Sequence, residues 1–235
     1  MSEHRTVSNR SSPDQTPVND GSLPVRWGAG IVNHGSYDDL DRCLDSLAHQ
    51  SLPASAIAIY DTGQLPRRFE EVRAAHPEFL LESGPNRGYA GGGNRVVERL
   101  ASEAKPLDYI LVLNPDVELD SDFSARLIEG IERHPRVAIA TGKLLRPDRV
   151  TLDSAGIFFP RNGRPRDRGS DVQDRGQFDA TELVDAVSGA AMMLRVPALG
   201  ALALEGELFD ESFVAYHEDT DPSWRARRLG WEIPS

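Results

Sequence analysis

Two hydrophobic patterns alternate along the chain from residue 25 onward. One is a short apolar run, typical of a buried strand, and the other is an apolar stripe at helical spacing. The runs that predict strands are Val25–Val32, Ala56–Tyr60, Phe79–Glu82, Tyr109–Leu113 and Val137–Thr141. The stripes that predict helices are Tyr37–Gln50, Arg67–Ala75, Gly91–Ser102 and Asp122–Arg133. This rhythm predicts an α/β fold with a mostly parallel central sheet flanked by helices.

The pattern becomes less regular after Lys143. The elements predicted there are an extended segment at Thr151–Phe159, a polar loop at Arg161–Gln177, strands at Leu183–Val187 and Ala191–Val196, and a helix at Trp224–Leu229. Residues 1–23 are rich in Ser, Asn, Asp, Pro and Thr, which predicts a disordered tail. We therefore expect one domain over residues 24–235.

Composition and charge narrow the class of protein. Lys and Arg number 26 and Asp and Glu 37, so the formal charge is −11; this disfavours nucleic-acid binding, which needs a basic surface. No apolar run reaches the roughly 18–20 residues of a membrane span, and the N-terminal residues lack the apolar segment of a signal peptide. The single cysteine, Cys43, has no partner for an internal disulfide and fits a reducing compartment. We therefore expect a cytoplasmic protein.

An acidic side chain follows the most apolar predicted strand. Tyr109–Leu113 is succeeded by Asn114-Pro115-Asp116, and the proline cannot continue a central strand because it has no N–H to donate. Asp116 is therefore expected at the carboxyl edge of the sheet, where ligands bind in open α/β folds. A carboxylate there suits a divalent metal that is also held by substrate phosphates. A simple turn explains the same sequence equally well.

Two further segments lie at ends of predicted strands. Asn86–Asn94 is rich in glycine and opens a helix, an arrangement that lets backbone approach a phosphate or a base. A tight strand-to-helix turn is an equally good reading, since the spacing matches no standard phosphate-binding loop. Asp61 can accept a hydrogen bond from a base or a ribose hydroxyl, although Asp61-Thr62-Gly63 also has ordinary turn chemistry.

Three carboxylates crowd the segment Glu218-Asp219-Thr220-Asp221. Carboxylates this close repel one another unless they are solvated, capped or paired. A helix N-terminus explains them structurally, because its dipole favours acids and Pro222 suits a first turn. Such a helix start can also present a general base, and His217 is an alternative base or ligand.

In this order, these segments resemble the inverting glycosyltransferases of family 2, which have the GT-A fold, and within them a rhamnosyltransferase-like subgroup. The matching motifs are Ile31-Val32-Asn33, Cys43-Leu44-Asp45-Ser46-Leu47, Asn86–Asn94, Leu113-Asn114-Pro115-Asp116-Val117, Ser188-Gly189-Ala190-Ala191-Met192, Phe209-Asp210-Glu211 and Glu218-Asp219-Thr220-Asp221. Each motif is weak by itself, and their shared order over about 200 residues makes the resemblance specific.

The resemblance implies a role for each matching residue. Asp219 would be the catalytic base, Glu218 would orient it or the acceptor, and Asp116 would bind a divalent metal, Mn²⁺ or Mg²⁺. The residues implied to bind the nucleotide-sugar are Asn33, Asp61, Asn86, Gly88, Gly91, Gly92, Asn94, Asn114 and Gly189. The implied partners are a nucleotide-diphospho-sugar donor, such as dTDP-rhamnose, and a glycan or lipid-linked glycan acceptor. A lipid-linked acceptor also implies peripheral association with the inner face of the cell membrane.

Three departures from the family pattern keep other readings open. Asp61 is followed by Thr62-Gly63, Asn114 stands where the family has its first metal-site acid, and the chain ends at Ser235, before the C-terminal part of the pattern. The early end of the chain and the Asp61 variant favour a catalytically impaired nucleotide-binding module, whereas intact Asp116 and Asp219 speak against it. A sugar-1-phosphate nucleotidyltransferase is a third reading, although it would carry its glycine-rich motif directly after the first strand.

Overall fold

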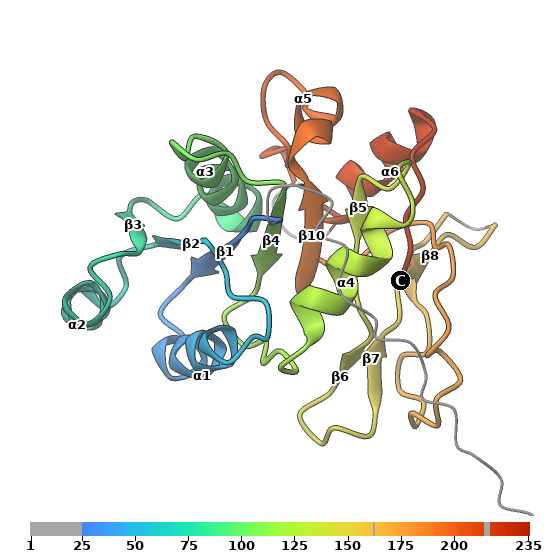
Figure 1. The fold of residues 1–235 in the computed structure, drawn as a ribbon, viewed down its shortest axis with the longest axis horizontal. Coiled ribbons are helices and arrows are strands. Elements are labelled where there is room, and N and C mark those ends of the chain that lie inside the picture. The colour runs from blue at the N-terminus through green and yellow to red at the C-terminus, as the bar shows by residue number, and fades with distance from the viewer. Residues whose placement is uncertain (1–24, 162, 214–216) are drawn as a thin grey trace, which may run out of the picture.

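A six-stranded sheet forms the centre of the computed structural model, which describes residues 25–161, 163–213 and 217–235 (Figure 1). Its strands stand in the order β3-β2-β1-β4-β10-β5. Their bounds are Trp27–Asn33 (β1), Ala56–Asp61 (β2), Leu80–Ser83 (β3), Tyr109–Leu113 (β4), Ile139–Ala140 (β5) and Ala191–Arg195 (β10). Strands β1 to β4 pair in parallel, while β10 is antiparallel to both β4 and β5. The predicted mostly parallel α/β sheet is confirmed.

Helices cover both faces of this sheet. Their bounds are Tyr37–Ala48 (α1), Pro66–Ala75 (α2), Gly88–Ala101 (α3), Phe123–Glu132 (α4), Leu199–Leu202 (α5) and Thr220–Arg228 (α6), with a 3₁₀ turn at Val196–Ala198 (η1). Two small antiparallel pairs lie beyond the sheet: Leu144–Leu145 (β6) with Leu152–Ser154 (β7), and Ile157–Phe158 (β8) with Arg166–Asp167 (β9). Within the described residues, no helix combines the length and apolarity that crossing a bilayer requires.

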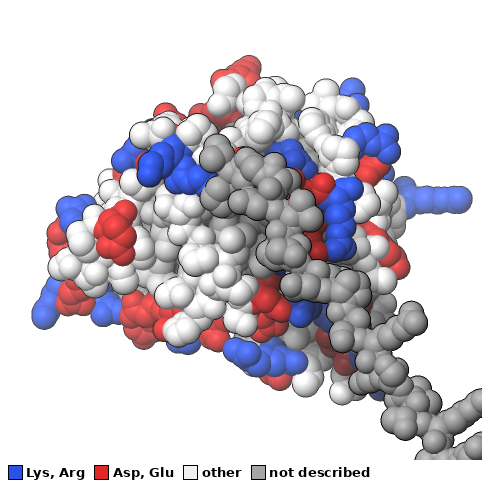
Figure 2. All heavy atoms as spheres, in the orientation of Figure 1, with Lys and Arg blue, Asp and Glu red and all other residues white. Residues whose placement is uncertain are grey.

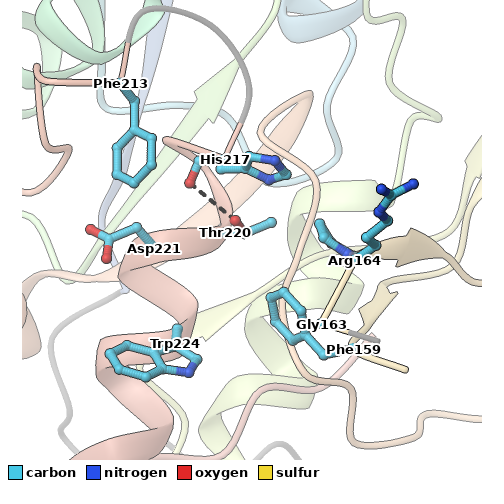
Figure 3. Close-up of a pocket in the computed structure, with 9 residues that line it drawn as sticks. Phe159, Gly163, Arg164, Phe213, His217, Thr220, Asp221 and Trp224 are labelled. Carbon is cyan, nitrogen blue, oxygen red and sulfur yellow. Dashed lines mark hydrogen bonds between the residues drawn. The ribbon is translucent and has the colours of Figure 1, made fainter. Parts of the chain in front are cut away.

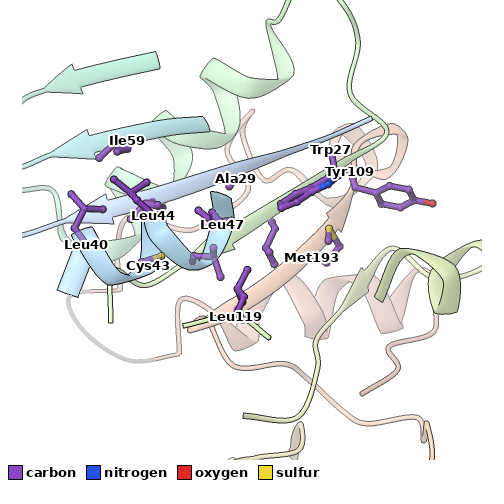
Figure 4. Close-up of a cluster of buried hydrophobic side chains, with 14 of the residues drawn as sticks. Trp27, Ala29, Leu40, Cys43, Leu44, Leu47, Ile59, Tyr109, Leu119 and Met193 are labelled. Carbon is purple, nitrogen blue, oxygen red and sulfur yellow. The ribbon is translucent and has the colours of Figure 1, made fainter. Parts of the chain in front are cut away.

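The side chains of β1 alternate between the two faces, as the period of two in a strand requires. Trp27, Ala29 and Ile31 are fully buried in the core cluster beneath α1 (Figure 4). The apolar stripe of α1, including Leu40 and Leu44, supplies the other half of this cluster. The hydrophobic pattern of the sequence therefore fixes which face of the sheet α1 covers.

Glycines bring α3 unusually close to the opposite face of the sheet. A Cβ atom built on Gly30 of β1 would lie 2.8 Å from Val96 Cγ2 of α3. A Cβ atom on Gly92 of α3 would lie 2.5 Å from Val32 Cγ1 of β1. Gly93 is equally constrained, because its Cβ atom would lie 2.8 Å from the ring of Phe209. The glycine-rich segment thus serves helix–sheet packing, which the sequence did not distinguish from ligand contact.

Replacing Gly92 by alanine is therefore expected to destabilise the fold by about 1–3 kcal/mol, the usual cost of overpacking a close-packed interior. Gly130 provides a matched control, since it also lies in a helix but has no atom within 4 Å of a built Cβ atom. Alanine at position 130 should stabilise the protein by about 0.5–1 kcal/mol. Urea unfolding of the two variants measures both effects, and equal stabilities would refute the packing role of Gly92.

Some predicted boundaries are wrong. Leu183–Val187 is not a strand: its residues make single bridges, Leu183 to Pro234 and Ala186 to Ile157, instead of a continuous ladder. The predicted strand at residues 137–141 is reduced to β5, because β10 pairs with only two of its residues. Helices α3 and α6 begin at Gly88 and Thr220, earlier than their apolar stripes indicate.

Charged side chains of both signs are interspersed on the face shown in Figure 2, around a largely uncharged centre. Proteins that bind nucleic acid non-specifically present a continuous basic surface instead. The prediction that this chain does not bind nucleic acid stays a prediction, and the surface on this face is compatible with it.

Candidate active site

Most of the predicted site residues lie at one edge of the sheet. Strands β1, β2 and β4 are parallel, so their carboxyl ends, at Asn33, Asp61 and Leu113, share that edge. The antiparallel β10 begins there, with Ala191 opposite Leu113. The Ser188-Gly189-Ala190 turn therefore lies beside the Asn114-Pro115-Asp116 turn, although more than 70 residues separate them in sequence.

The Asn114-Pro115-Asp116 turn is fixed by backbone hydrogen bonds. Asn114 N–H donates to Ala190 O at 3.0 Å, and Val117 N–H donates to Asn114 O at 3.3 Å. The side chain of Asp116 is exposed and makes no hydrogen bond or ion pair with any described residue. The next acid along, Glu118, differs, because Arg42 and Arg149 pair with it. Within the described part of the chain, Asp116 thus presents a carboxylate that has no structural partner.

A buried thiol lies under this turn. Cys43 of α1 is fully buried, and its Sγ lies 3.9 Å from Asn114 O, to which it donates. Burial raises the pKa of the Cys43 thiol to about 12, and the charges of Asp116 and Glu118 add to this rise. The cysteine is therefore a protonated core residue that supports the turn, as its place in the apolar stripe predicts.

The donor set at Asp116 fits a divalent cation that a substrate helps to bind. Among the described residues, no group of three or more His, Cys, Asp or Glu side chains could hold a metal ion. A cation at Asp116 would therefore take one protein carboxylate, with the neighbouring Asn114 amide oxygen as a second candidate ligand. Hard cations such as Mg²⁺ are commonly bound in this way, with phosphates of the substrate completing the shell.

The Gly189 turn joins the β4 edge to the acidic segment. Gly189 N–H donates to Asp219 Oδ2 at 2.9 Å, and Tyr89 Oη donates to Gly189 O at 2.6 Å. A side chain at position 189 would collide with Asp219, since a built Cβ atom lies 2.9 Å from Asp219 Cβ. Burial raises the pKa of Tyr89, and the charges of Asp219 and Glu218 raise it further, so the phenol remains a proton donor.

The three acids of the C-terminal segment have different surroundings. Asp221 accepts a hydrogen bond from Arg225 Nε at 2.9 Å and forms an ion pair with Nη2 of the same guanidinium at 2.8 Å, so its charge is compensated. Asp219 is half-buried and directly precedes α6, where the helix dipole favours a carboxylate. Glu218 is also half-buried, and its Oε2 is a buried atom with no hydrogen-bond partner among the described residues.

Because Asp221 is paired with Arg225, Glu218 and Asp219 are the two acids of this segment that could take part in a reaction. Burial raises the pKa of Glu218, and the nearby charge of Asp219 adds to the effect. His217, which precedes them, is exposed and has a φ of 77°, a left-handed conformation that non-glycine residues rarely adopt. Such strain is often found where a structure must hold functional side chains in place.

Asp61 and Asn33 are committed to a buried network. Asp61 Oδ2 accepts hydrogen bonds from Asn33 Nδ2 and from Tyr37 Oη, each at 2.7 Å, and Gly63 N–H donates to Oδ1 at 2.7 Å. Both Asp61 and Asn33 are fully buried. The structure thus supports the turn reading of Asp61-Thr62-Gly63, and contact of these two residues with a nucleotide stays a prediction.

The residues predicted around the start of α3 have distinct local roles. Asn86 is exposed and accepts a hydrogen bond from Gly88 N–H at 2.9 Å, and Gly88 has a φ of 68°, which suits glycine. Asn94 instead makes two hydrogen bonds of 2.8 Å with the backbone of Phe209. Gly91, Gly92 and Asn94 thus serve packing, while Asn86 and Gly88 remain accessible for a ligand.

The structure adds one site residue that the sequence reasoning did not single out. Tyr89 connects the start of α3 to Gly189, 100 positions away, and packs edge-to-face on Phe209 with 5.8 Å between ring centroids. Its position between two glycines of the Asn86–Asn94 segment was a signal, because a large aromatic residue there must pack against something. The predicted sugar-site residue Gly189 and the predicted base Asp219 are thus brought together by direct contact.

Comparisons with known proteins agree on the family and the fold of this chain. The model of the family described as "Glycosyl transferase family 2" matches residues 29–199. An N-acetylglucosaminyl-diphospho-decaprenol L-rhamnosyltransferase of Mycobacterium tuberculosis is 27% identical over 224 residues, which are 85% of this chain and 70% of that protein. The low-salt glycan biosynthesis hexosyltransferase Agl10 of Haloferax volcanii is 27% identical over 155 residues, covering 63% of this chain and 46% of that protein.

Solved structures show the same fold. The mannosyltransferase PcManGT from Pyrobaculum calidifontis, solved in complex with GDP-Man and Mn²⁺, superimposes with a TM-score of 0.60 at 14% identity, over 88% of this chain and 53% of that one. TarS of S. aureus gives a TM-score of 0.59 at 15% identity, over 89% of this chain and 35% of that one. The chain thus spans about half or less of these neighbours' lengths, and the likeness establishes the fold.

Proposed function

The chain belongs to glycosyl transferase family 2, and from that membership we propose that it transfers a sugar from a nucleotide-diphospho-sugar to a glycan or lipid-linked glycan with inversion at the anomeric carbon. The family establishes the glycosyltransferase class. The named mycobacterial relative supports a rhamnose donor such as dTDP-rhamnose and an acceptor attached to a polyprenyl diphosphate.

One contact network carries the proposal. Asn114 N–H donates to Ala190 O, and the adjacent Gly189 N–H donates to Asp219 Oδ2. Asp116, whose carboxylate has no hydrogen-bond or ion-pair partner among the described residues, and the half-buried Asp219 therefore both adjoin one short turn. Sugar transfer needs two such groups at one site, one for the leaving diphosphate and one to accept a proton.

Asp116, with the Asn114 amide, would hold a divalent cation on the donor side, and the mannosyltransferase neighbour solved with GDP-Man and Mn²⁺ supports that choice. When bound, such a cation neutralises charge that develops on a leaving diphosphate. The exposed Asn86 and the N-terminal turn of α3, at Gly88, lie at the same sheet edge and are positioned for the phosphates or the base. The remaining predicted nucleotide contacts would require Asp61 and Asn33 to exchange partners within their buried network.

Asp219 acts as the general base on the acceptor side. The acceptor hydroxyl oxygen attacks the anomeric carbon while the bond from that carbon to the diphosphate oxygen breaks. The bonding electron pair leaves with the nucleoside diphosphate, and the hydroxyl proton passes to the Asp219 carboxylate. Glu218, with its unpartnered buried Oε2, orients the acceptor or the base. Because the base and the leaving group lie on opposite sides, the anomeric configuration inverts.

The stereochemistry of the product tests this function. We expect the chain, incubated with dTDP-rhamnose, Mn²⁺ and a soluble N-acetylglucosaminyl diphosphate ester, to release dTDP and form a glycoside of inverted configuration, measured by NMR of the anomeric proton. UDP- and GDP-sugars serve as alternative donors in parallel reactions. A product with retained configuration from any donor would contradict the opposed-base arrangement. Absence of transfer from all of them would contradict the proposed activity of this chain.

A further inference from the structure

A cavity of about 600 Å³ opens directly beside the acidic segment. Thr220 and Asp221, which follow the proposed base, line one wall, and His217, which precedes Glu218, lines another part. The remaining walls come from Phe213, from Trp224 of α6 and from the connection between β8 and β9. The proposed reaction leaves this cavity without a role.

Three aromatic rings dominate the lining of this cavity. Phe159, Phe213 and Trp224 all line it, and Figure 3 shows Phe213 and Trp224 on one side of the view with Phe159 on the other. Trp224 is 48% exposed, which is high for so large an apolar side chain on a folded surface. The Arg228 guanidinium lies 4.8 Å from the centroid of the indole ring, a cation–π contact.

Four polar side chains are among the described residues that line the cavity: Arg164, His217, Thr220 and Asp221. Asp221 is held by Arg225 and offers carboxylate oxygens, and Thr220 Oγ1 donates to His217 O at 3.0 Å. Arg164 adds a cation at the rim opposite α6 (Figure 3). Small-ligand sites usually combine apolar and aromatic side chains with a small number of fixed polar groups, and this lining contains both kinds. An aromatic wall beside a carboxylate suits a sugar, which has an apolar ring face and a rim of hydroxyls.

The cavity lies on the acceptor side of the proposed base. None of its lining residues belongs to β1, β2, α3 or the Asn114-Pro115-Asp116 turn, which form the donor side. Asp219 contacts the donor side through Gly189, whereas the residues on both sides of Glu218-Asp219 line the cavity. A ligand in the cavity would therefore lie next to the segment that carries the proposed base, among residues that belong to none of the donor-side elements.

We propose that this cavity binds the sugar ring of the acceptor, stacked against Trp224 and Phe159, and so presents its hydroxyl to Asp219. This inference rests on the proposed function and adds to it the residues that select the acceptor. Trp224 and Phe159 bind the sugar through the apolar face of its ring. They are acceptor-binding residues and take no part in proton transfer.

Binding without turnover tests this inference independently of the transfer reaction. The probe is an N-acetylglucosaminyl diphosphate with a short alkyl chain, titrated calorimetrically into the full chain in the absence of donor. Trp224→Ala and Phe159→Ala should each weaken its binding at least about tenfold, a loss of about 1.4 kcal/mol. The matched controls are Phe158→Ala and Leu229→Ala, which remove apolar side chains that are 41% and 56% exposed, do not line the cavity and should leave the affinity unchanged.

Several outcomes would overturn the proposal. It fails if the wild-type chain does not bind the probe at millimolar concentration, if the alkyl diphosphate without the sugar binds equally well, or if Phe158→Ala weakens binding as much as Phe159→Ala. It also fails if Trp224→Ala weakens the binding of dTDP, because the cavity would then belong to the donor. Sugar-dependent probe binding in a chain that transfers no sugar would leave the cavity assignment standing and refute the proposed activity.

Discussion

Replacing Asp219 by asparagine should lower kcat for sugar transfer by about 10²–10⁴-fold, the range that general-base catalysis typically contributes. An asparagine oxygen can still accept the hydrogen bond that Gly189 N–H donates to Asp219 Oδ2 at 2.9 Å. The turn therefore keeps its geometry, while the side chain loses its ability to take a proton at neutral pH. Steady-state kinetics with dTDP release as the readout measures the effect.

Two further variants separate the roles of the acidic residues. Glu218→Gln removes the neighbouring carboxylate, whose Oε2 is buried and unpartnered, and should lower kcat less than Asp219→Asn because the proton acceptor remains. Asp221→Asn breaks the pair with Arg225 and should act mainly on stability. A near-normal kcat in Asp219→Asn together with a large loss in Glu218→Gln would reverse the two assignments.

The sequence predicts the sheet well because hydrophobic periodicity reports local burial. Tyr109–Leu113 is the same strand in the prediction and in the structure, since five buried apolar residues followed by proline leave little freedom. Leu183–Val187 has a similar apolar pattern but is not a strand. Its backbone instead makes isolated bonds with the C-terminal residues, such as Val184 N–H to Ile233 O at 2.9 Å. A local hydrophobic pattern does not show with which distant residues a segment forms backbone hydrogen bonds.

The candidate site also shows that a local sequence pattern does not reveal contacts between distant residues. The positions of Asp116 and Asp219 at element ends follow from the sequence, whereas their connection depends on Gly189, a residue distant from both. The sequence leaves the glycines of α3 open between ligand contact and a tight turn, and the structure accounts for Gly92 by its close approach to Val32. Asp61 is open in the same way, and its carboxylate accepts hydrogen bonds from Asn33, Tyr37 and Gly63. The spacing of residues along the sequence identifies polar groups at the edge of the sheet. It does not show which of these groups already have hydrogen-bond partners within the protein.

Replacing Asp116 by alanine should abolish metal-dependent donor binding. Asp116 has no partner among the described residues, so its removal costs the fold little. It is the carboxylate proposed to hold the cation. Loss of even an outer-shell partner typically weakens metal affinity by about 10–100-fold, so loss of the ligand itself should exceed that range. Asp120→Ala is the matched control, because Asp120 is an exposed acid four residues further along the same segment and should bind donor normally.

A single set of calorimetric titrations tests most directly the claim that Asp116 holds the donor while Asp219 serves the acceptor. dTDP is titrated with and without Mn²⁺ into the wild-type chain, Asp116→Ala, Asp120→Ala and Asp219→Asn, with UDP and GDP as parallel ligands. We predict Mn²⁺-dependent binding of one nucleotide to the wild type, Asp120→Ala and Asp219→Asn, and its loss in Asp116→Ala. Equal nucleotide affinity in wild type and Asp116→Ala, or binding that does not depend on Mn²⁺, would contradict the account.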